Sequence, residues 1–448
     1  MRNFFVDKTV LALSVSALLF IGGAAALAVY QPVAAIALIG AVIVLATFPF
    51  TKLYVAVTAV SLPLSAVLAA ATPIGYVALC DVTAMIAIAS FCMSRIGNDK
   101  GPLQANRGEL LLPVRLFIGL AIPYFAVSLY SVLTNDGQVS VAVQRVELII
   151  VWLIFGALLF QSKSLNLFIK WFIGCCVVLS LAWIAAPGVG GVLGIQKNPS
   201  GGFISAALIM LILSRVPNVL RFPGIVVLCG GLLSTGSRGS MLGIGVAAVL
   251  LILFIQQWRR IFVPFFVAGV GSLVAFVSLP SHVTARILSQ DDAGAYNIDI
   301  RGLFVTDALD RFREAPWSGV GVGNYMQQHP GLLSVQTHDP HNVFALSLAE
   351  GGYPLLIGFV VMSAGPLLWL LGKRKTSIVA LAIAVQTSTL VHAFVDVYWV
   401  RGTPAVGWLL VGAAAAYLFV EGRTSEEASV GSPNDQTRLG RSPARMLV

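Results

Sequence analysis

The chain has 448 residues, which by length alone allows two or three soluble domains. Its composition argues against them, because hydrophobic residues make up 58% and charged residues only 10%, whereas about 25% of a soluble protein is charged. The sequence therefore predicts a polytopic membrane protein and excludes a soluble enzyme, a disordered chain and a coiled coil. We attribute the net charge of +9 to basic residues that fix cytoplasmic loops, so we expect no nucleic-acid partner.

Apolar runs recur along the chain, and a helix needs about 20 apolar residues to cross the hydrocarbon layer. The predicted spans are residues 9–30, 33–49, 52–71, 76–93, 114–133, 145–161, 166–186, 200–214, 222–235, 239–257, 261–280, 353–372, 377–397 and 403–420. The first run is too long and too poor in a cleavage site for a signal peptide, so we interpret it as an uncleaved helix. The predicted fold class is all-α, a transmembrane helical protein with about 12–14 spans.

Lys and Arg predict the orientation, because cytoplasmic loops carry an excess of them. With the N-terminus inside and strict alternation, 20 of the 28 basic residues lie inside and eight outside. The predicted domains are then eleven spans in residues 1–280, one large outer loop at 281–352, further spans in 353–421, and a polar cytoplasmic tail at 422–448 that we expect to be disordered.

The outer loop is predicted to contain two helices. The first covers about residues 300–315, with an apolar face and with Asn297 or Asp299 as its cap. Arg301 would then lie in the first turn, and Pro316 would end the helix.

The second loop helix is predicted to begin with Asp339 as N-cap and to stop at Gly351-Gly352. His341 would occupy position N2, where the helix field disfavours the protonated ring and leaves the imidazole able to act as a general base. Between the two helices, the glycine-rich residues 319–324 follow no strand, so we interpret them as a backbone turn and not as a dinucleotide-binding motif.

Three polar motifs on the predicted outer side begin helices. They are Lys197-Asn198-Pro199, Ser237-Arg238-Gly239-Ser240 and His338-Asp339-Pro340-His341-Asn342. Free N–H groups and the positive end of the helix dipole gather at such starts, so each motif is a candidate anion site. Arginine adds a planar fork that suits phosphate oxygens. The residues alone thus predict a phosphate-binding site with a base beside it.

Simpler interpretations exist for each of these residues. Arg238 and Lys197 could be anchors at the membrane interface, and Arg301 could merely pair with Asp299 or Asp307. Arg311 and Arg313 are expected to form a solvated face with Asp310 and Glu314, and Glu350 could hold the second loop helix against its neighbours.

We expect neither a metal nor a cofactor. His338 and His341 would need a third ligand, and the nearby Asp339 is expected to be used as the cap. The five cysteines lie in apolar runs without a CxxC spacing, so we expect neither metal nor disulfide from them.

At these residues the sequence resembles the O-antigen ligase family, the membrane domain shared by O-antigen ligases and related polysaccharide polymerases. The resemblance rests on Arg301, the glycine-rich residues 316–325, residues 338–342 and Glu350-Gly351-Gly352, with the lysine and Ser-Arg motifs upstream, and it covers roughly residues 190–355. It implies an inverting, metal-independent glycosyltransferase in the bacterial inner membrane, with its site facing the periplasm.

The resemblance also implies the partners and the residues. The donor would be a glycan on undecaprenyl pyrophosphate, and the acceptor a hydroxyl of a lipid-linked sugar, either lipid A-core or a growing polysaccharide. The essential arginines would be Arg238 and Arg301, and the essential histidine would be His341. We take the following as candidates for binding substrate: Lys197, Asn198, His338 and Asn342.

Three functions remain open at this stage. An O-antigen ligase is favoured, and a polymerase would use the same chemistry with another acceptor. A transporter would require charges near the bilayer midplane and paired repeats, and Asp81 is the only clear acid within a predicted span.

Overall fold

The computed structural model describes residues 51–65, 67–72, 75–96, 112–186, 191–214, 216–254, 292–325, 340–373, 376–396 and 402–430. Its helices are α3 Thr51–Ser61, α4 Leu79–Ile96, α5 Leu112–Thr134, α6 Val139–Gln161, α7 Leu165–Ala185, α8 Lys197–Leu213, α9 Asn218–Thr235, α10 Arg238–Phe254, α13 Asp292–Glu314, α14 Val343–Leu371, α15 Ser377–Val395 and α16 Thr403–Val430. Its strands are β1 Ala69–Thr72, β2 Gly75–Ala78, β3 Gly191–Val192 and β4 Ile195–Gln196.

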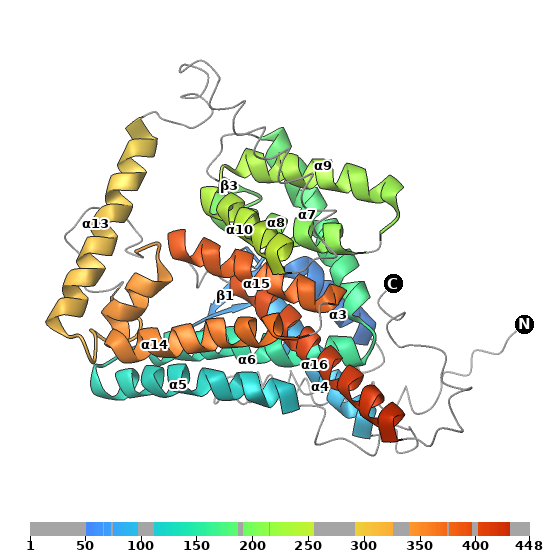
Figure 1. Ribbon diagram of the computed structural model, residues 1–448. Coiled ribbons are helices and arrows are strands. Elements are labelled where there is room, and N and C mark those ends of the chain that lie inside the picture. The colour runs from blue at the N-terminus through green and yellow to red at the C-terminus, as the bar shows by residue number, and fades with distance from the viewer. Residues whose placement is uncertain are drawn as a thin grey trace, which may run out of the picture.

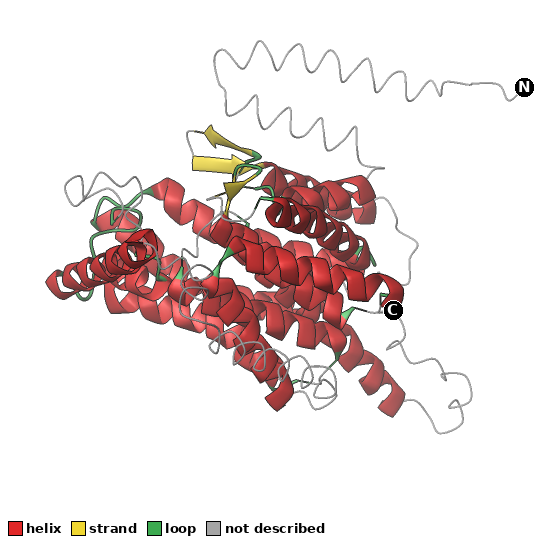
Figure 2. Ribbon diagram, turned by 90° about the horizontal axis from the view of Figure 1, so that it is seen from above, coloured by secondary structure: helices red, strands yellow, loops and turns green. Residues whose placement is uncertain are grey.

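The predicted all-α membrane fold is confirmed. Within the described residues, seven helices are long and apolar enough to cross a membrane, namely α5, α6, α7, α9, α14, α15 and α16. Shorter apolar helices lie within α4, α8 and α10. The strands form two small antiparallel hairpins, which Figure 2 shows gathered at one side of the helical bundle. The predicted spans 9–30, 33–49 and 261–280 lie outside the described residues.

The helices pack in layers around α15 and α16, the most buried of the candidate spans. In Figure 1, α5, α6 and α14 lie below α15, α7 to α10 lie above it, α16 runs from the centre to the lower right, and α13 stands apart at one end. The helices α6 and α16 approach each other closely at Gly156 and Gly412, where a side chain would collide with the backbone of the facing helix. Small residues at a helix interface allow such an approach within a membrane, where packing replaces the hydrophobic effect.

One predicted span is wrong. Residues 52–71 do not form a single helix, because α3 ends at Ser61 and the chain then turns into the β1–β2 hairpin. The cause is visible in the sequence: Pro63 lacks a backbone N–H, and a helix usually ends before the residue that precedes a proline.

Two helices are longer than predicted. The helix α13 begins at Asp292, so Arg301 lies in its middle and Asn297 and Asp299 are internal residues instead of caps. Asn and Asp cost only up to about 0.7 kcal/mol inside a helix, which is too little to stop it. At the other end of the chain, α16 is helical over residues 422–430 of the predicted disordered tail, and the rest of that tail lies outside the described residues.

The start of α14 also differs from the prediction. Its N-cap is Asn342, whose Oδ1 accepts hydrogen bonds from the backbone N–H groups of Phe344 and Ala345. His341 therefore precedes the cap and is not at position N2, while Asp339 lies outside the described residues. Both residues are good caps, and only Asn342 directly precedes the apolar helix.

Candidate active site

The C-terminal end of α15 is the point where the candidate residues gather. It is contacted by Arg301 from α13, by His341 just before α14, and by Gly239 from the first turn of α10. These segments are far apart in the chain, and Figure 1 shows α10, α13 and the start of α14 around this end of α15. Segments that carry Arg301 and His341, and the helix that Arg238 begins, therefore meet at this end of α15.

His341 is held in an unusual backbone conformation that turns it toward Asp396. Its φ is +51°, in the left-handed region, which costs a residue with a Cβ on the order of 1–3 kcal/mol. Its Nδ1 lies 3.0 Å from Oδ1 of Asp396, a residue that directly follows α15. The aspartate side chain is 4% exposed and the histidine side chain 22% exposed, so a buried carboxylate orients a ring that solvent can reach.

His392, one turn before Asp396, extends this contact into the bundle. Its Nε2 lies 3.5 Å from Oδ2 of Asp396, and its Nδ1 lies 3.4 Å from Oγ of Ser240. The Ser240 hydroxyl lies in turn 2.8 Å from that of Ser237. Polar side chains thus connect His341 to the first turn of α10, the helix that Arg238 begins.

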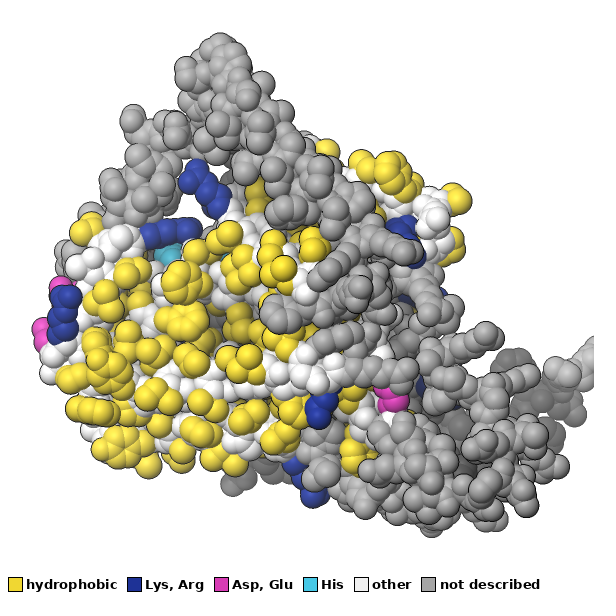
Figure 3. All heavy atoms as spheres, viewed as in Figure 1, with side chains coloured by type: hydrophobic (Ala, Val, Ile, Leu, Met, Phe, Trp, Pro, Cys, Tyr) yellow, Lys and Arg dark blue, Asp and Glu magenta, His cyan; other side chains and the backbone are white. Residues whose placement is uncertain are grey.

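One arginine contacts the end of α15 directly, and the other begins a helix that packs against it. Arg301 is half-buried and donates from Nη1 to the backbone oxygen of Val395 at 3.2 Å, so it does not simply pair with Asp307. Arg238 is exposed, and its neighbour Gly239 packs directly against the His392 ring. Figure 3 shows Lys or Arg side chains beside a histidine in the upper left, above a broad hydrophobic face.

The start of α8 also packs against the residues at the end of α15. The β3–β4 hairpin leads directly into Lys197, which is exposed, and Asn198, which is half-buried. Gly201 packs against Ser237 and Ser240, and Gly202 packs against His392. The lysine motif therefore lies on the same side of the bundle as His341. His338 lies outside the described residues.

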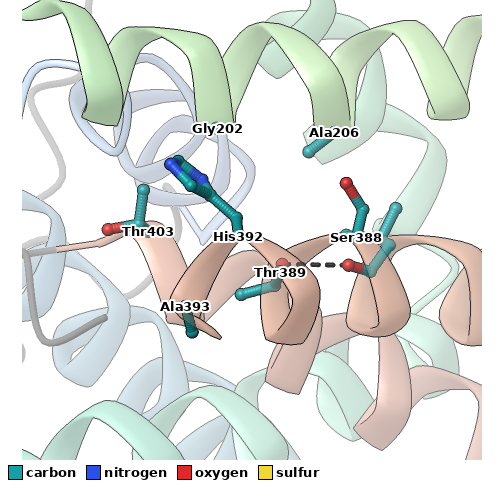
Figure 4. A pocket seen from close by; sticks show the side chains of 8 residues that line it. Gly202, Ala206, Ser388, Thr389, His392, Ala393 and Thr403 are labelled. Atoms are coloured by element: carbon teal, nitrogen blue, oxygen red, sulfur yellow. Dashed lines mark hydrogen bonds between the residues drawn. The ribbon is translucent and has the colours of Figure 1, made fainter. Parts of the chain in front are cut away.

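A small pocket opens beside His392, between α8, α15 and α16. It is lined by Gly202, Ala206, Val385, Ser388, Thr389, His392, Ala393 and Thr403. Figure 4 shows the imidazole pointing across α15 toward Gly202 and Thr403. The lining is uncharged apart from the histidine, so the pocket suits a small neutral polar group such as water.

The glycine-rich turn has the structural role that we predicted. Gly319, Gly321 and Gly323 all have positive φ. Gly321 N–H donates to the backbone oxygen of Glu350 at 3.0 Å, and Gly323 N–H donates to its Oε1 at 2.9 Å. Glu350 also forms a buried ion pair with Arg145 of α6. Hydrogen bonds to Glu350 therefore attach the glycine-rich turn to α14, and the ion pair with Arg145 holds α14 against α6 as expected.

The exposed face of α13 also matches the prediction. Arg311 pairs with Glu314 and Arg313 with Asp310, each three residues apart on the helix. Such exposed pairs contribute about 0–1 kcal/mol, so these arginines are not part of the site.

Two residues of the site, Asp396 and His392, were not predicted from the sequence. A signal existed, because a histidine and an aspartate four residues apart at the end of an apolar span are costly to bury and usually have a function. We find no group of three or more His, Cys, Asp or Glu that could hold a metal within the described ranges.

A comparison with protein families matches part of the chain, which begins after Lys197 and Asn198. Residues 223–360 match the family model described as O-Antigen ligase. The match includes Arg238, Arg301, His341 and Glu350, whereas His392 and Asp396 follow it in the chain. A search of curated proteins found no match. The resemblance seen in the sequence is thereby confirmed.

Proposed function

We propose, from the O-antigen ligase family domain that this membrane protein carries at residues 223–360, that it transfers a glycan from undecaprenyl pyrophosphate to a hydroxyl of a lipid-linked acceptor. The reaction inverts the anomeric centre and needs no metal ion. The acceptor that we favour is lipid A-core, which makes the protein an O-antigen ligase.

The observation that carries this proposal is the 3.0 Å contact between His341 Nδ1 and Asp396 Oδ1, at the point where Arg301 reaches the end of α15. A carboxylate on Nδ1 fixes the tautomer in which Nε2 accepts a proton. In the reaction, the acceptor oxygen attacks the anomeric carbon and its proton passes to Nε2 of His341. The bond from that carbon to the pyrophosphate oxygen breaks, and the electron pair leaves with the phosphate.

The arginines stabilise the departing pyrophosphate. This group is a good leaving group, so its departure requires charge stabilisation and no general acid. Arg301, which contacts the α15 end, and Arg238, which begins the helix packed against that end, supply the guanidinium groups for the developing negative charge. Lys197 and Asn198 at the start of α8 are placed to contact the remaining phosphate or sugar oxygens.

The position of the site suits substrates that are anchored in lipid. It lies where the hydrophobic face of Figure 3 ends, so the charged parts of a lipid pyrophosphate would meet the arginines while its chain stays among apolar side chains. Holding both substrates in one membrane plane lowers the entropic cost of their meeting.

The charges at the opposite end of the bundle support a periplasmic site in the bacterial inner membrane. Lys163 follows α6 and Lys373 follows α14, and both helices begin at the end where the site lies. Basic residues are enriched in cytoplasmic loops, so the end that carries His341 faces the periplasm.

The direct test is glycan transfer by the purified chain in proteoliposomes that contain the lipid-linked donor and lipid A-core. We expect His341→Ala and Arg238→Ala each to lower the transfer rate at least about 100-fold. A positioned base contributes about 10²- to 10⁴-fold, and one group that stabilises developing charge contributes about 10²- to 10³-fold. Arg313→Ala, which removes an exposed pair with Asp310, should retain the wild-type rate. Near-full transfer by either site variant refutes the role of that residue, and strict dependence on a divalent cation refutes the metal-free reaction.

A polymerase is the second candidate, because the family domain fits both activities and the two differ in the acceptor. A deletion strain separates them. Loss of glycan on lipid A-core, with normal chain lengths in the lipid-linked pool, supports the ligase, whereas accumulation of single repeats supports the polymerase.

A further inference from the structure

His392 lies outside the matched family domain and has no assigned role, yet it is the most enclosed charged or titratable neighbour of Asp396 among the described residues. The residue is 8% exposed. Its ring is enclosed by Gly202 of α8 and Gly239 of α10, since a Cβ at either glycine would fall within 3.3 Å of an imidazole atom. The two glycines therefore limit the space around the ring, and Nε2 lies 3.5 Å from Oδ2 of Asp396.

The contacts of the ring define an oriented polar chain. Neutral His392 can donate from Nε2 toward Oδ2 of Asp396, 3.5 Å away, only if Nδ1 accepts from the Ser240 hydroxyl, 3.4 Å away. Ser240 then accepts from the hydroxyl of Ser237, 2.8 Å away. These contacts lead from Ser237 to the carboxylate that also holds His341, and the last of them, from Nε2 to Oδ2, is longer than a good hydrogen bond.

The Nε2 atom is buried and has no hydrogen-bond partner in the described part of the chain. Its distance to Asp396 exceeds a good hydrogen bond, so the contact with the carboxylate is mainly electrostatic. A buried imidazole N–H is costly without an acceptor, and the carboxylate is the one group close enough to compensate for it.

We propose that His392 is a positioning residue for the transfer reaction, which fixes the Asp396 carboxylate from its second oxygen and so sets the orientation and tautomer of His341. This inference rests on the proposed function. When His341 takes the acceptor proton, the carboxylate must face the new imidazolium. With Oδ1 at His341 and Oδ2 facing His392, rotation of the carboxylate would lose both contacts, and Ser240 connects His392 to the helix that Arg238 begins.

The positioning role predicts a difference between two substitutions. His392→Gln keeps a nitrogen donor near the position of Nε2, whereas His392→Leu has a similar volume without a donor. We expect kcat of His392→Leu to fall about tenfold or more, a part of the roughly 10²- to 10⁴-fold that a base contributes, while KM for the lipid-linked donor stays within twofold. We expect kcat of His392→Gln to stay within about threefold of wild type.

The experiment measures glycan transfer to lipid A-core by each full-length variant in proteoliposomes at matched protein content. A kcat of His392→Leu within twofold of wild type overturns the inference. So does equal loss in the two variants, because a ring that only fills space would not distinguish them in this way. A wild-type protein without transfer activity overturns the proposed function and this inference with it, whereas an active wild type with unaffected variants overturns the inference alone.

Discussion

The buried ion pair between Arg145 and Glu350 makes a strong prediction about stability. Replacing Glu350 with alanine removes the carboxylate that pairs with Arg145 of α6 and accepts the Gly323 N–H at 2.9 Å. The two charged side chains are only 6% and 1% exposed, so water cannot replace the lost partner.

The expected magnitude follows from these contacts. Removing one partner of a buried pair costs about 3–5 kcal/mol, because the other charge stays buried. The unsatisfied N–H of Gly323 adds about 1–3 kcal/mol. The two costs overlap in one network, so we expect Glu350→Ala to lower the free energy of unfolding by about 4 kcal/mol or more. The double variant Arg145→Met/Glu350→Leu removes both charges and should recover at least about half of that loss.

Unfolding of the purified variants in mixed micelles of mild detergent and SDS measures these differences. Glu314→Ala is the matched control, because it removes an exposed carboxylate that also pairs with an arginine, and it should change stability by less than about 1 kcal/mol. If Glu350→Ala unfolds like the control, or if the double variant is as unstable as the single one, the assignment of Glu350 as the fastening of the glycine-rich turn is refuted.

Two further predictions concern the site and the bend in α14. Asp396→Asn should lower the rate of glycan transfer about 100-fold or more without loss of folded protein, because an amide favours the wrong tautomer of His341; wild-type transfer by this variant contradicts the proposed pairing. Gly352→Ala should destabilise the protein by about 1–3 kcal/mol, because the φ of Gly352 is +63° and a Cβ there would collide with the backbone of Pro316. Gly119→Ala is the control, because a Cβ at Gly119 meets open space. Similar unfolding curves for the two variants would show that the bend in α14 is not required.

The sequence predicted the parts of the structure that depend on local composition. Apolar runs are long and continuous, so most spans within the described residues were located correctly. The error at residues 52–71 arose because Pro63, which lacks a backbone N–H, ends the helix within an otherwise apolar run. The break in α14 at Gly351-Gly352 was also predicted from the two glycines. Both have non-helical backbone angles, and Gly352 has a φ of +63°, which favours glycine.

Helix starts were less predictable than helices. Asp339-Pro340 and Asn342 are both favourable beginnings for the helix that follows, and their intrinsic preferences differ by little. The fold uses Asn342, which allows His341 to leave the helix and take a left-handed conformation toward Asp396. Such a choice depends on a partner that lies 55 residues further along the chain, so local preferences could not reveal it.

The same reason explains why Asp396 and His392 were missed while Arg238, Arg301 and His341 were found. The latter three lie in polar motifs at predicted helix starts or in the loop. Asp396 and His392 lie at the end of an apolar span, where the surrounding sequence forms no polar motif that would draw attention to them.

Close approach of helix ends is what turns these scattered residues into one site. Gly201 and Gly202 at the start of α8, and Gly239 at the start of α10, leave room for Ser237 and for the His392 ring. A side chain at Gly201 would push α8 away from the start of α10, and one at Gly202 or Gly239 would push its helix away from α15. The main role of the glycines beside the lysine and arginine motifs is therefore close packing of helices, and not backbone flexibility. Close packing brings helices that carry cations near the base His341. A lipid-linked pyrophosphate would present its charge at the same boundary.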